Sequence, residues 1–104
     1  GVNNLQSRSE ILDEAKRLVT RDRNDTYGEP EALFEAISLA WEALDMARGD
    51  RPHEACDVAL KFAVFKAIRA AAAPDHMDSW IDGCGYFACG GEIAAVTLRV
   101  VCAP

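Results

Sequence analysis

The apolar residues of this chain recur with the period of an α-helix along almost its whole length. In the segment 9–23 they occupy one stripe, formed by Ile11, Leu12, Ala15, Leu18 and Val19. A stripe with this spacing covers one face of a helix that has 3.6 residues per turn. No segment shows the alternation of apolar and polar residues that a half-buried strand requires. The sequence therefore predicts an all-α fold.

Turn-forming residues divide this pattern into four helices. We expect them at residues 9–23, 30–47, 52–73 and 76–101, separated by segments that contain glycine or proline. Ser9 is expected to cap the first helix, because a serine hydroxyl can accept a hydrogen bond from the backbone of the first turn. The helix at 52–73 is apolar on most of its sides, which predicts a central position.

The 104 residues are expected to form one domain, 1–104, with residues 1–7 as a flexible N-terminal segment. The expected architecture is a four-helix bundle-like domain. Gly83, Gly85, Gly90 and Gly91 fall inside the last helix, where each glycine costs on the order of 1 kcal/mol relative to alanine. That cost implies close approach of backbones or space for a ligand. Small bundles commonly associate through apolar faces, so we expect a homo-oligomer, either a dimer or a tetramer.

The charge of the chain limits its partners. The net charge is −6 and the isoelectric point is about 4.8, and the lysines and arginines are scattered rather than arranged in a basic stripe. A nucleic-acid polymer is therefore not an expected ligand. No apolar run approaches the roughly 20 residues that span a bilayer, so we expect no membrane association and a cytoplasmic location.

The cysteines lack the CxxC spacing of structural zinc sites. They all fall in apolar helical segments, where a free cysteine behaves as a small hydrophobic residue. We therefore interpret all four as reduced core residues, namely Cys56, Cys84, Cys89 and Cys102.

Acidic residues in two places form a candidate metal site. Asp78 and Asp82 are four apart and share one helix face, where two carboxylates repel each other unless water or a cation lies between them. Glu54 and Asp57 begin the preceding helix, and a tight turn at Pro74 is expected to bring the two groups within a few ångströms to a turn or two of each other. Hard cations such as Mg²⁺, with Mn²⁺ as an alternative, take oxygen ligands of this kind. The other interpretation of all four acids is that they cap or favour helix N-termini.

Cations and tyrosines form a candidate anion-binding site. Lys66 and Arg69 are three apart on an otherwise apolar helix, where a charge needs a partner. They could bind phosphate, or pair with Asp75, Asp78 or Asp82. Tyr27, in a Gly-Pro turn, could stack on a base or anchor a loop, and Tyr86 could contact a ligand or direct its hydroxyl to a buried partner.

In this order the residues resemble a set of small helical proteins encoded by phages and prophages. The resemblance extends from Ile11 to Glu92. It rests on the segments Tyr27-Gly28-x-Pro30, Phe34 with Ile37 and Trp41, Asp57-Val58-Ala59-Leu60, Lys66-x-x-Arg69, and Asp78-x-Trp80-x-Asp82-x-x-Gly85-Tyr86.

More distantly, the layout is similar to the all-α nucleoside triphosphate pyrophosphohydrolases, the MazG-like and dimeric dUTPase superfamily. Members hold Mg²⁺ with a helical ExxE and a second helical ExxD. Glu54-x-x-Asp57 would correspond to the first pair, and Asp75-x-x-Asp78, or Asp78 with Asp82, to the second. The chain departs from that pattern by using aspartate at several glutamate positions.

This resemblance implies a chemistry. Asp57, Asp78 and Asp82 would be catalytic and, with Glu54, would bind Mg²⁺, which bridges phosphates and activates water for attack on the α/β linkage of a (deoxy)nucleoside triphosphate. Lys66 and Arg69 would neutralise the phosphates, Tyr27 or Trp41 would contact the base, and Tyr86 would contribute to substrate binding. A phage-encoded enzyme of this kind would act in the cytoplasm of its bacterial host.

Two other functions fit the same residues. The first is a phage protein that binds and sequesters a nucleotide without hydrolysing it, which needs the cations and aromatic residues but no metal. The second is a structural helical module that interacts with other proteins, in which the acids are solvated helix caps.

Overall fold

The computed structural model describes residues 7–20 and 29–97. Within these residues the chain forms four helices and no strand, so the predicted all-α single domain is confirmed. The helices are α1 (Arg8–Val19), α3 (Pro30–Arg48), α4 (Ala55–Ala72) and α5 (Met77–Thr97). The expected extensions of the first helix to residue 23 and of the last to residue 101 reach outside the described residues, as does the predicted flexibility of residues 1–6.

Ser7, rather than Ser9, caps α1. The Ser7 hydroxyl accepts a hydrogen bond from the Glu10 backbone N–H at 3.1 Å, and the Glu10 carboxylate accepts one from the Ser7 N–H at 3.2 Å. This reciprocal capping box requires glutamate or glutamine three residues after the serine, which Ser7 has and Ser9 lacks. The prediction for Ser9 is therefore wrong.

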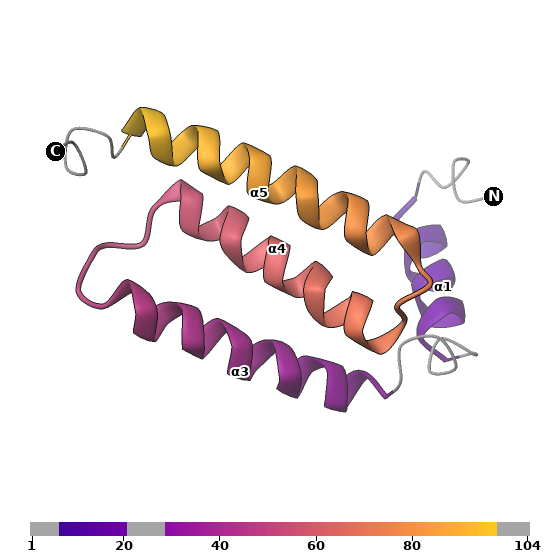
Figure 1. Cartoon of the computed structure of the whole chain (residues 1–104). Coiled ribbons are helices and arrows are strands. Elements are labelled where there is room, and N and C mark those ends of the chain that lie inside the picture. Colours follow the sequence, from indigo (N-terminus) through magenta and orange to yellow (C-terminus); the bar gives the residue numbers. More distant parts are fainter. Residues whose placement is uncertain (1–6, 21–28, 98–104) are drawn as a thin grey trace, which may run out of the picture.

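The helices α3, α4 and α5 lie side by side, with α4 between the other two (Figure 1). Consecutive helices run in opposite directions, because each connection between them is short. The predicted central position of the third helix is confirmed. Its start is not, because α4 begins at Ala55 and the segment before it, 52–54, is not helical.

The core consists mainly of small side chains. Among the described residues no large side chain is fully buried, and the buried hydrophobic residues are Ile37, Cys56, Ala59, Ala63, Ala70 and Ala73. All except Ile37 belong to α4 or to the residue that follows it. Small residues allow α4 and α5 to approach closely: a Cβ atom added to Gly90 would lie 2.7 Å from the Ala59 Cβ. Part of the expected close approach of backbones is therefore present within one chain.

Two tight connections orient the three helices. Gly49 ends α3 with a φ of 66°, a left-handed conformation that glycine adopts without steric cost. Between α4 and α5 the His76 N–H donates to the Ala73 carbonyl at 3.1 Å. The Trp80 indole donates to the Pro74 carbonyl at 3.0 Å, so this turn is fastened to the first turn of α5.

The cysteine predictions hold in part. Cys56, Cys84 and Cys89 are free thiols, as expected, but Cys84 and Cys89 are exposed and only Cys56 is buried. Cys102 lies outside the described residues. No described helix is long and apolar enough to cross a membrane.

Candidate functional site

Two cations of α4 lie near the same aromatic ring. The Lys66 ammonium is 5.6 Å from the centre of the Phe65 ring, and the Arg69 guanidinium carbon is 5.2 Å from it. At these distances a cation is attracted to the face of the ring. Three-residue spacing gives Lys66 and Arg69 neighbouring positions on the helix surface, so α4 carries a local concentration of positive charge beside Phe65.

Lys66 also pairs with a predicted site residue of α5. Its Nζ atom lies 3.0 Å from an Asp82 carboxylate oxygen. The Lys66 side chain is 17% exposed and that of Asp82 is 47% exposed, so the pair is open to solvent on the carboxylate side. The ion-pair alternative for Lys66 is therefore confirmed in this structure. An anion that approaches Lys66 would compete with Asp82 or share the ammonium with it.

An aromatic cavity of about 510 Å³ lies between α3 and α4. It is lined by Phe34, Ile37, Ser38, Trp41, Phe62 and Phe65. The Trp41 indole donates to the Lys61 carbonyl at 3.1 Å, which fixes the orientation of that ring. A mainly apolar cavity of this size with a few polar groups at its edge is typical of a small-molecule site.

Tyr86 extends the aromatic cluster onto α5. Its ring centre lies 5.3 Å from that of Phe62, with the two planes at 56°. Tilted pairs of this kind stabilise the contact beyond simple burial. Because Phe62 also lines the cavity, Tyr86 is connected to the cavity through one ring. Its predicted role in substrate binding stays a prediction.

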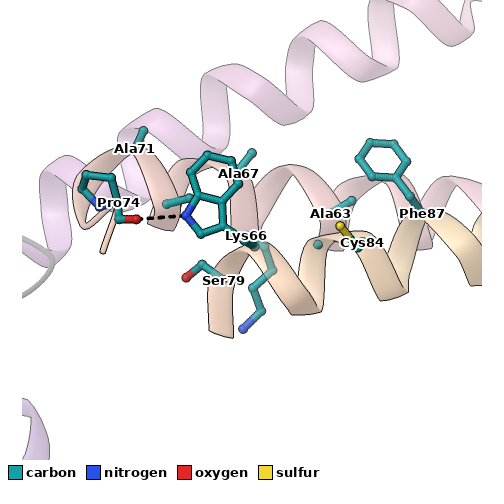
Figure 2. Close-up of a pocket in the computed structure, with 11 residues that line it drawn as sticks. Ala63, Lys66, Ala67, Ala71, Pro74, Ser79, Cys84 and Phe87 are labelled. Carbon is teal, nitrogen blue, oxygen red and sulfur yellow. Dashed lines mark hydrogen bonds between the residues drawn. The ribbon is translucent and has the colours of Figure 1, made fainter. Parts of the chain in front are cut away.

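A second, mostly apolar cavity of about 470 Å³ lies between α4 and α5 and is lined largely by small residues. Figure 2 shows Cys84 and Phe87 of α5 at one end of it and the turn at Pro74 at the other. The stem of Lys66 lines this cavity as well. Apart from Lys66 and Ser79, its lining carries no group suited to bind a charged ligand.

Asp57 has structural partners at the start of α4. Both of its carboxylate oxygens accept hydrogen bonds from the Arg51 guanidinium, at 2.5 and 3.0 Å, and one also accepts the Glu54 N–H at 2.7 Å. The side chain is 6% exposed. The Arg51 hydrogen bonds hold the pKa of Asp57 at about 2, below its usual 3.8, and the Glu54 N–H acts in the same direction. These contacts match the capping interpretation of Glu54 and Asp57.

The structure does not bring Asp57 near Asp82. Gly90 packs on Ala59, whereas Gly83 packs on Lys66, so Asp82 lies at the level of Lys66. Nine residues separate Asp57 from Lys66 on α4, which corresponds to about 14 Å along the helix. Asp78 lies one further turn away. The expected proximity of the two acidic groups is therefore wrong, because the turn at Pro74 sets a register that pairs the start of α5 with the end of α4.

Asp78 and Asp82 remain as an exposed pair one turn apart on α5. In the described part of the chain, no group of three or more histidine, cysteine, aspartate or glutamate residues is placed to hold a metal ion. Mg²⁺ is often held by one or two carboxylates together with substrate phosphates. Two carboxylates alone are therefore better suited to bind a metal ion together with a phosphorylated ligand than to bind the ion without one.

Comparison with known proteins establishes the family of the chain. Residues 10–94 match a family described as "Domain of unknown function (DUF6378)". The chain belongs to the DUF6378 family. The match includes α3 and α4 completely and α5 up to residue 94, and so both cavities and every predicted site residue.

A phage protein is among the relatives of this DUF6378 chain. The "Gene 55 protein" of Mycobacterium phage D29 is 35% identical over 80 residues, which are 76% of this chain and 50% of that protein. The chain thus spans about half the length of this relative. The predicted likeness to a small phage protein is confirmed at this level. No solved structure matches.

Within the DUF6378 domain, the sequence analysis did not anticipate some residues of the aromatic cavity. Tyr27 lies outside the described residues, so its predicted role stays a prediction. Phe34, Phe62 and Phe65 line the aromatic cavity although the sequence did not single them out as site residues. The spacing of residues on α4 could have indicated them. Phe62 and Phe65 are three apart, as are Lys66 and Arg69, so the members of each pair are neighbours on the helix surface.

Proposed function

We propose that the DUF6378 domain of this chain binds a (deoxy)nucleoside phosphate. The base would enter the aromatic cavity between α3 and α4, and the phosphates would lie on Lys66 and Arg69. The observation that carries this proposal is the position of Phe65. Its ring lines the cavity and is also the ring near which both cations lie.

The chemistry of the two halves matches that of a nucleotide. Aromatic side chains stack on any base, because every base has a π-face. Lysine acts as a point charge for phosphate, and arginine can bind phosphate oxygens with two parallel hydrogen bonds. The chain has a net charge of −6, so an anionic ligand needs such local positive charge to approach.

The catalytic form of this proposal is a Mg²⁺-dependent nucleoside triphosphate pyrophosphohydrolase of MazG-like type. Asp78 and Asp82 would hold the ion, and Mn²⁺ could replace it. Glu54 and Asp57, the other predicted ligands, lie too far along α4 to share that ion. Bound Mg²⁺ would polarise the phosphates and lower the pKa of a water molecule. The protein's own contribution would be to orient the triphosphate with Lys66 and Arg69 and to hold the base away from water.

Binding without hydrolysis is the second candidate function, and one observation favours it. Asp57 is engaged by Arg51, so only two of the four predicted metal ligands are left near the cations. A protein that sequesters a nucleotide needs the aromatic cavity and the cations but no metal centre.

A thermal-shift titration with nucleoside mono-, di- and triphosphates and with cyclic nucleotides, in Mg²⁺ and in EDTA, tests the proposal. Stabilisation by one triphosphate in Mg²⁺ alone, with release of pyrophosphate, supports the enzyme. Stabilisation that persists in EDTA without product supports sequestration.

Variants decide whether the ligand occupies the proposed site. Lys66→Met and Arg69→Met should each weaken binding at least about tenfold, the loss expected when a charged hydrogen bond is removed. Lys16→Met, on exposed α1, is the control and should bind like the wild type. A domain that no nucleotide stabilises, or that both variants leave unchanged, rules out this function and leaves the interaction module.

A further inference from the structure

One face of α5 carries apolar or small residues at alternating intervals of four and three. These residues, which we call the α5 seam, are Met77, Ile81, Cys84, Ala88, Gly91 and Ala95. Alternating intervals of four and three are those that pack two helices together along a coiled-coil contact. All six are exposed, whereas the buried residues of α5, Ser79 and Gly90, belong to its other side, which faces α4.

No contact among the described residues requires glycine at Gly91. Gly90 must lack a side chain, because a Cβ atom there would collide with Ala59. A Cβ atom at Gly91, like one at Gly85, would meet nothing within 4 Å in the described part of the chain. Of these two open glycines only Gly91 lies in the seam, where the lack of a side chain leaves room for a surface from outside the chain.

The exposed side chains around the seam point to the same conclusion. Met77 and Ile81 are 58% and 65% exposed, and Trp80 and Phe87, which flank the seam, are 54% and 57% exposed. Apolar patches of this kind on a small domain mark an interaction surface. The described part of the chain also has few large buried side chains. A partner on this surface would therefore contribute to stability as well.

The order of residue sizes along the seam identifies the partner. We propose that a second copy of this chain packs antiparallel on the α5 seam, with its two-fold axis midway between Cys84 and Ala88. In that register Met77 of one copy faces Ala95 of the other, Ile81 faces Gly91, and Cys84 faces Ala88. Each large side chain thus faces a small one, which close packing requires. A parallel pair would place Ile81 against Ile81 and Gly91 against Gly91, leaving a gap.

The two flanks of the seam differ in character. Trp80 and Phe87 border one flank beside the cavity between α4 and α5, and Figure 2 shows Phe87 and Cys84 at that cavity. Asp78 and Glu92 border the other flank. In the antiparallel register Asp78 of one copy lies at nearly the level of Glu92 of the other, so like charges oppose association. Added salt screens such charges and should therefore tighten the dimer.

Sedimentation velocity of the full chain over about 1 to 100 μM tests the pairing. The wild type should be a dimer, and Gly91→Leu should dissociate it, with the dissociation constant raised at least about tenfold. The space around Gly91 within one chain is open, so this variant should remain folded, which circular dichroism checks. Gly85→Leu is the matched control: it also places leucine at an open glycine, but outside the seam.

A size swap tests the register itself. The double variant Ile81→Ala with Gly91→Leu again places a large residue opposite a small one, and it should restore the dimer. A monomeric wild type would overturn the proposal. That is also the result expected if α1 of the same chain, rather than a second copy, covers the seam. A Gly91→Leu chain that remains a dimer, or a double variant that remains a monomer, would also overturn it.

Discussion

Asp57 stabilises the beginning of α4 by joining Arg51 to the backbone of Glu54. Its carboxylate takes three hydrogen bonds, two of them from a guanidinium. A carboxylate engaged in this way is hydrogen-bonded in its charged form, and that is why its pKa lies at about 2. At the residue scale, the stability of the fold therefore depends on the ionisation of the Asp57 carboxylate.

Asp57→Asn should lower the free energy of unfolding by about 2 kcal/mol at neutral pH, because the charged hydrogen bonds between the buried Asp57 carboxylate and Arg51 are lost. The folded-state pKa is depressed, so this stability is fully present above the usual pKa of 3.8 and is lost as the pH falls toward about 2. Urea unfolding of both proteins at about pH 7, 5 and 3 measures the difference.

Asp50→Asn is the control, because Asp50 is exposed and close in sequence. It should change stability by less than about 0.5 kcal/mol. A difference for Asp57→Asn that is as large at about pH 3 as at about pH 7 would contradict the assignment of the low pKa to this carboxylate.

Asp82 should have opposite effects on nucleotide binding and on metal-dependent turnover. Asp82→Asn releases Lys66 and removes a negative charge, so nucleotide binding in EDTA should tighten several-fold. Any Mg²⁺-dependent hydrolysis should fall, since one of two metal carboxylates is lost. Calorimetric titration in EDTA, together with a pyrophosphate-release assay in Mg²⁺, separates the two effects.

Glu42→Gln, an exposed charge change on α3, is the control for long-range electrostatics. It should alter binding less than Asp82→Asn does. Weaker binding of Asp82→Asn in EDTA would show that Lys66 is not the phosphate contact.

At the scale of elements, the glycines of α5 have two different roles. Gly83 and Gly90 face α4, where Gly90 allows the helix axes to approach at Ala59, while Gly85 and Gly91 face open space. Packing against α4 therefore requires glycine at Gly90, whereas no contact among the described residues requires it at Gly85 or Gly91.

Gly90→Ala should destabilise the fold by about 1–3 kcal/mol in packing, which outweighs the gain of about 1 kcal/mol in helix propensity. A Cβ atom there would lie 2.7 Å from the Ala59 Cβ, and neither atom is at the end of a flexible side chain. Gly85→Ala should instead stabilise the chain by up to about 1 kcal/mol. Thermal unfolding followed by circular dichroism compares the two. A stabilised Gly90→Ala chain would mean that α4 and α5 are farther apart than described.

At the scale of the whole molecule, the layer of α3, α4 and α5 buries little apolar surface for its length. Four of the six buried hydrophobic residues are alanine, and sixteen large hydrophobic side chains among the described residues are at least 36% exposed. A single copy therefore buries few large side chains among its described residues. If the proposed dimer forms, we expect association to contribute to the stability of the fold.

The midpoint of thermal unfolding should consequently rise with protein concentration, by a few degrees between about 10 and about 100 μM. Differential scanning calorimetry at these concentrations measures it. Gly91→Leu should abolish the dependence, whereas Gly85→Leu should retain it. A wild-type midpoint that does not change with concentration would mean that the single chain is stable without a partner.

The sequence by itself determined the secondary structure and the central helix. Hydrophobic periodicity and turn residues are local signals, so the helices were predicted within a few residues of their bounds, with α4 in the middle. The capping box at Ser7 could also have been found from local spacing, because Glu10 follows it by three residues. Lys66 was correctly expected to need a partner, because a cation on an apolar helix is costly wherever it is placed.

Only the tertiary structure decided which distant residues meet. The register between α4 and α5 depends on the geometry of the Pro74 turn and on the packing of Gly90 against Ala59. Neither the turn geometry nor the packing contact can be obtained from residue spacing. That register separates Asp57 from Asp82, selects Asp82 among three acids as the partner of Lys66, and brings Tyr86 to Phe62. The physical reason is that helix formation depends on neighbours in the chain, whereas a site depends on contacts between helices, and those are fixed by side-chain packing.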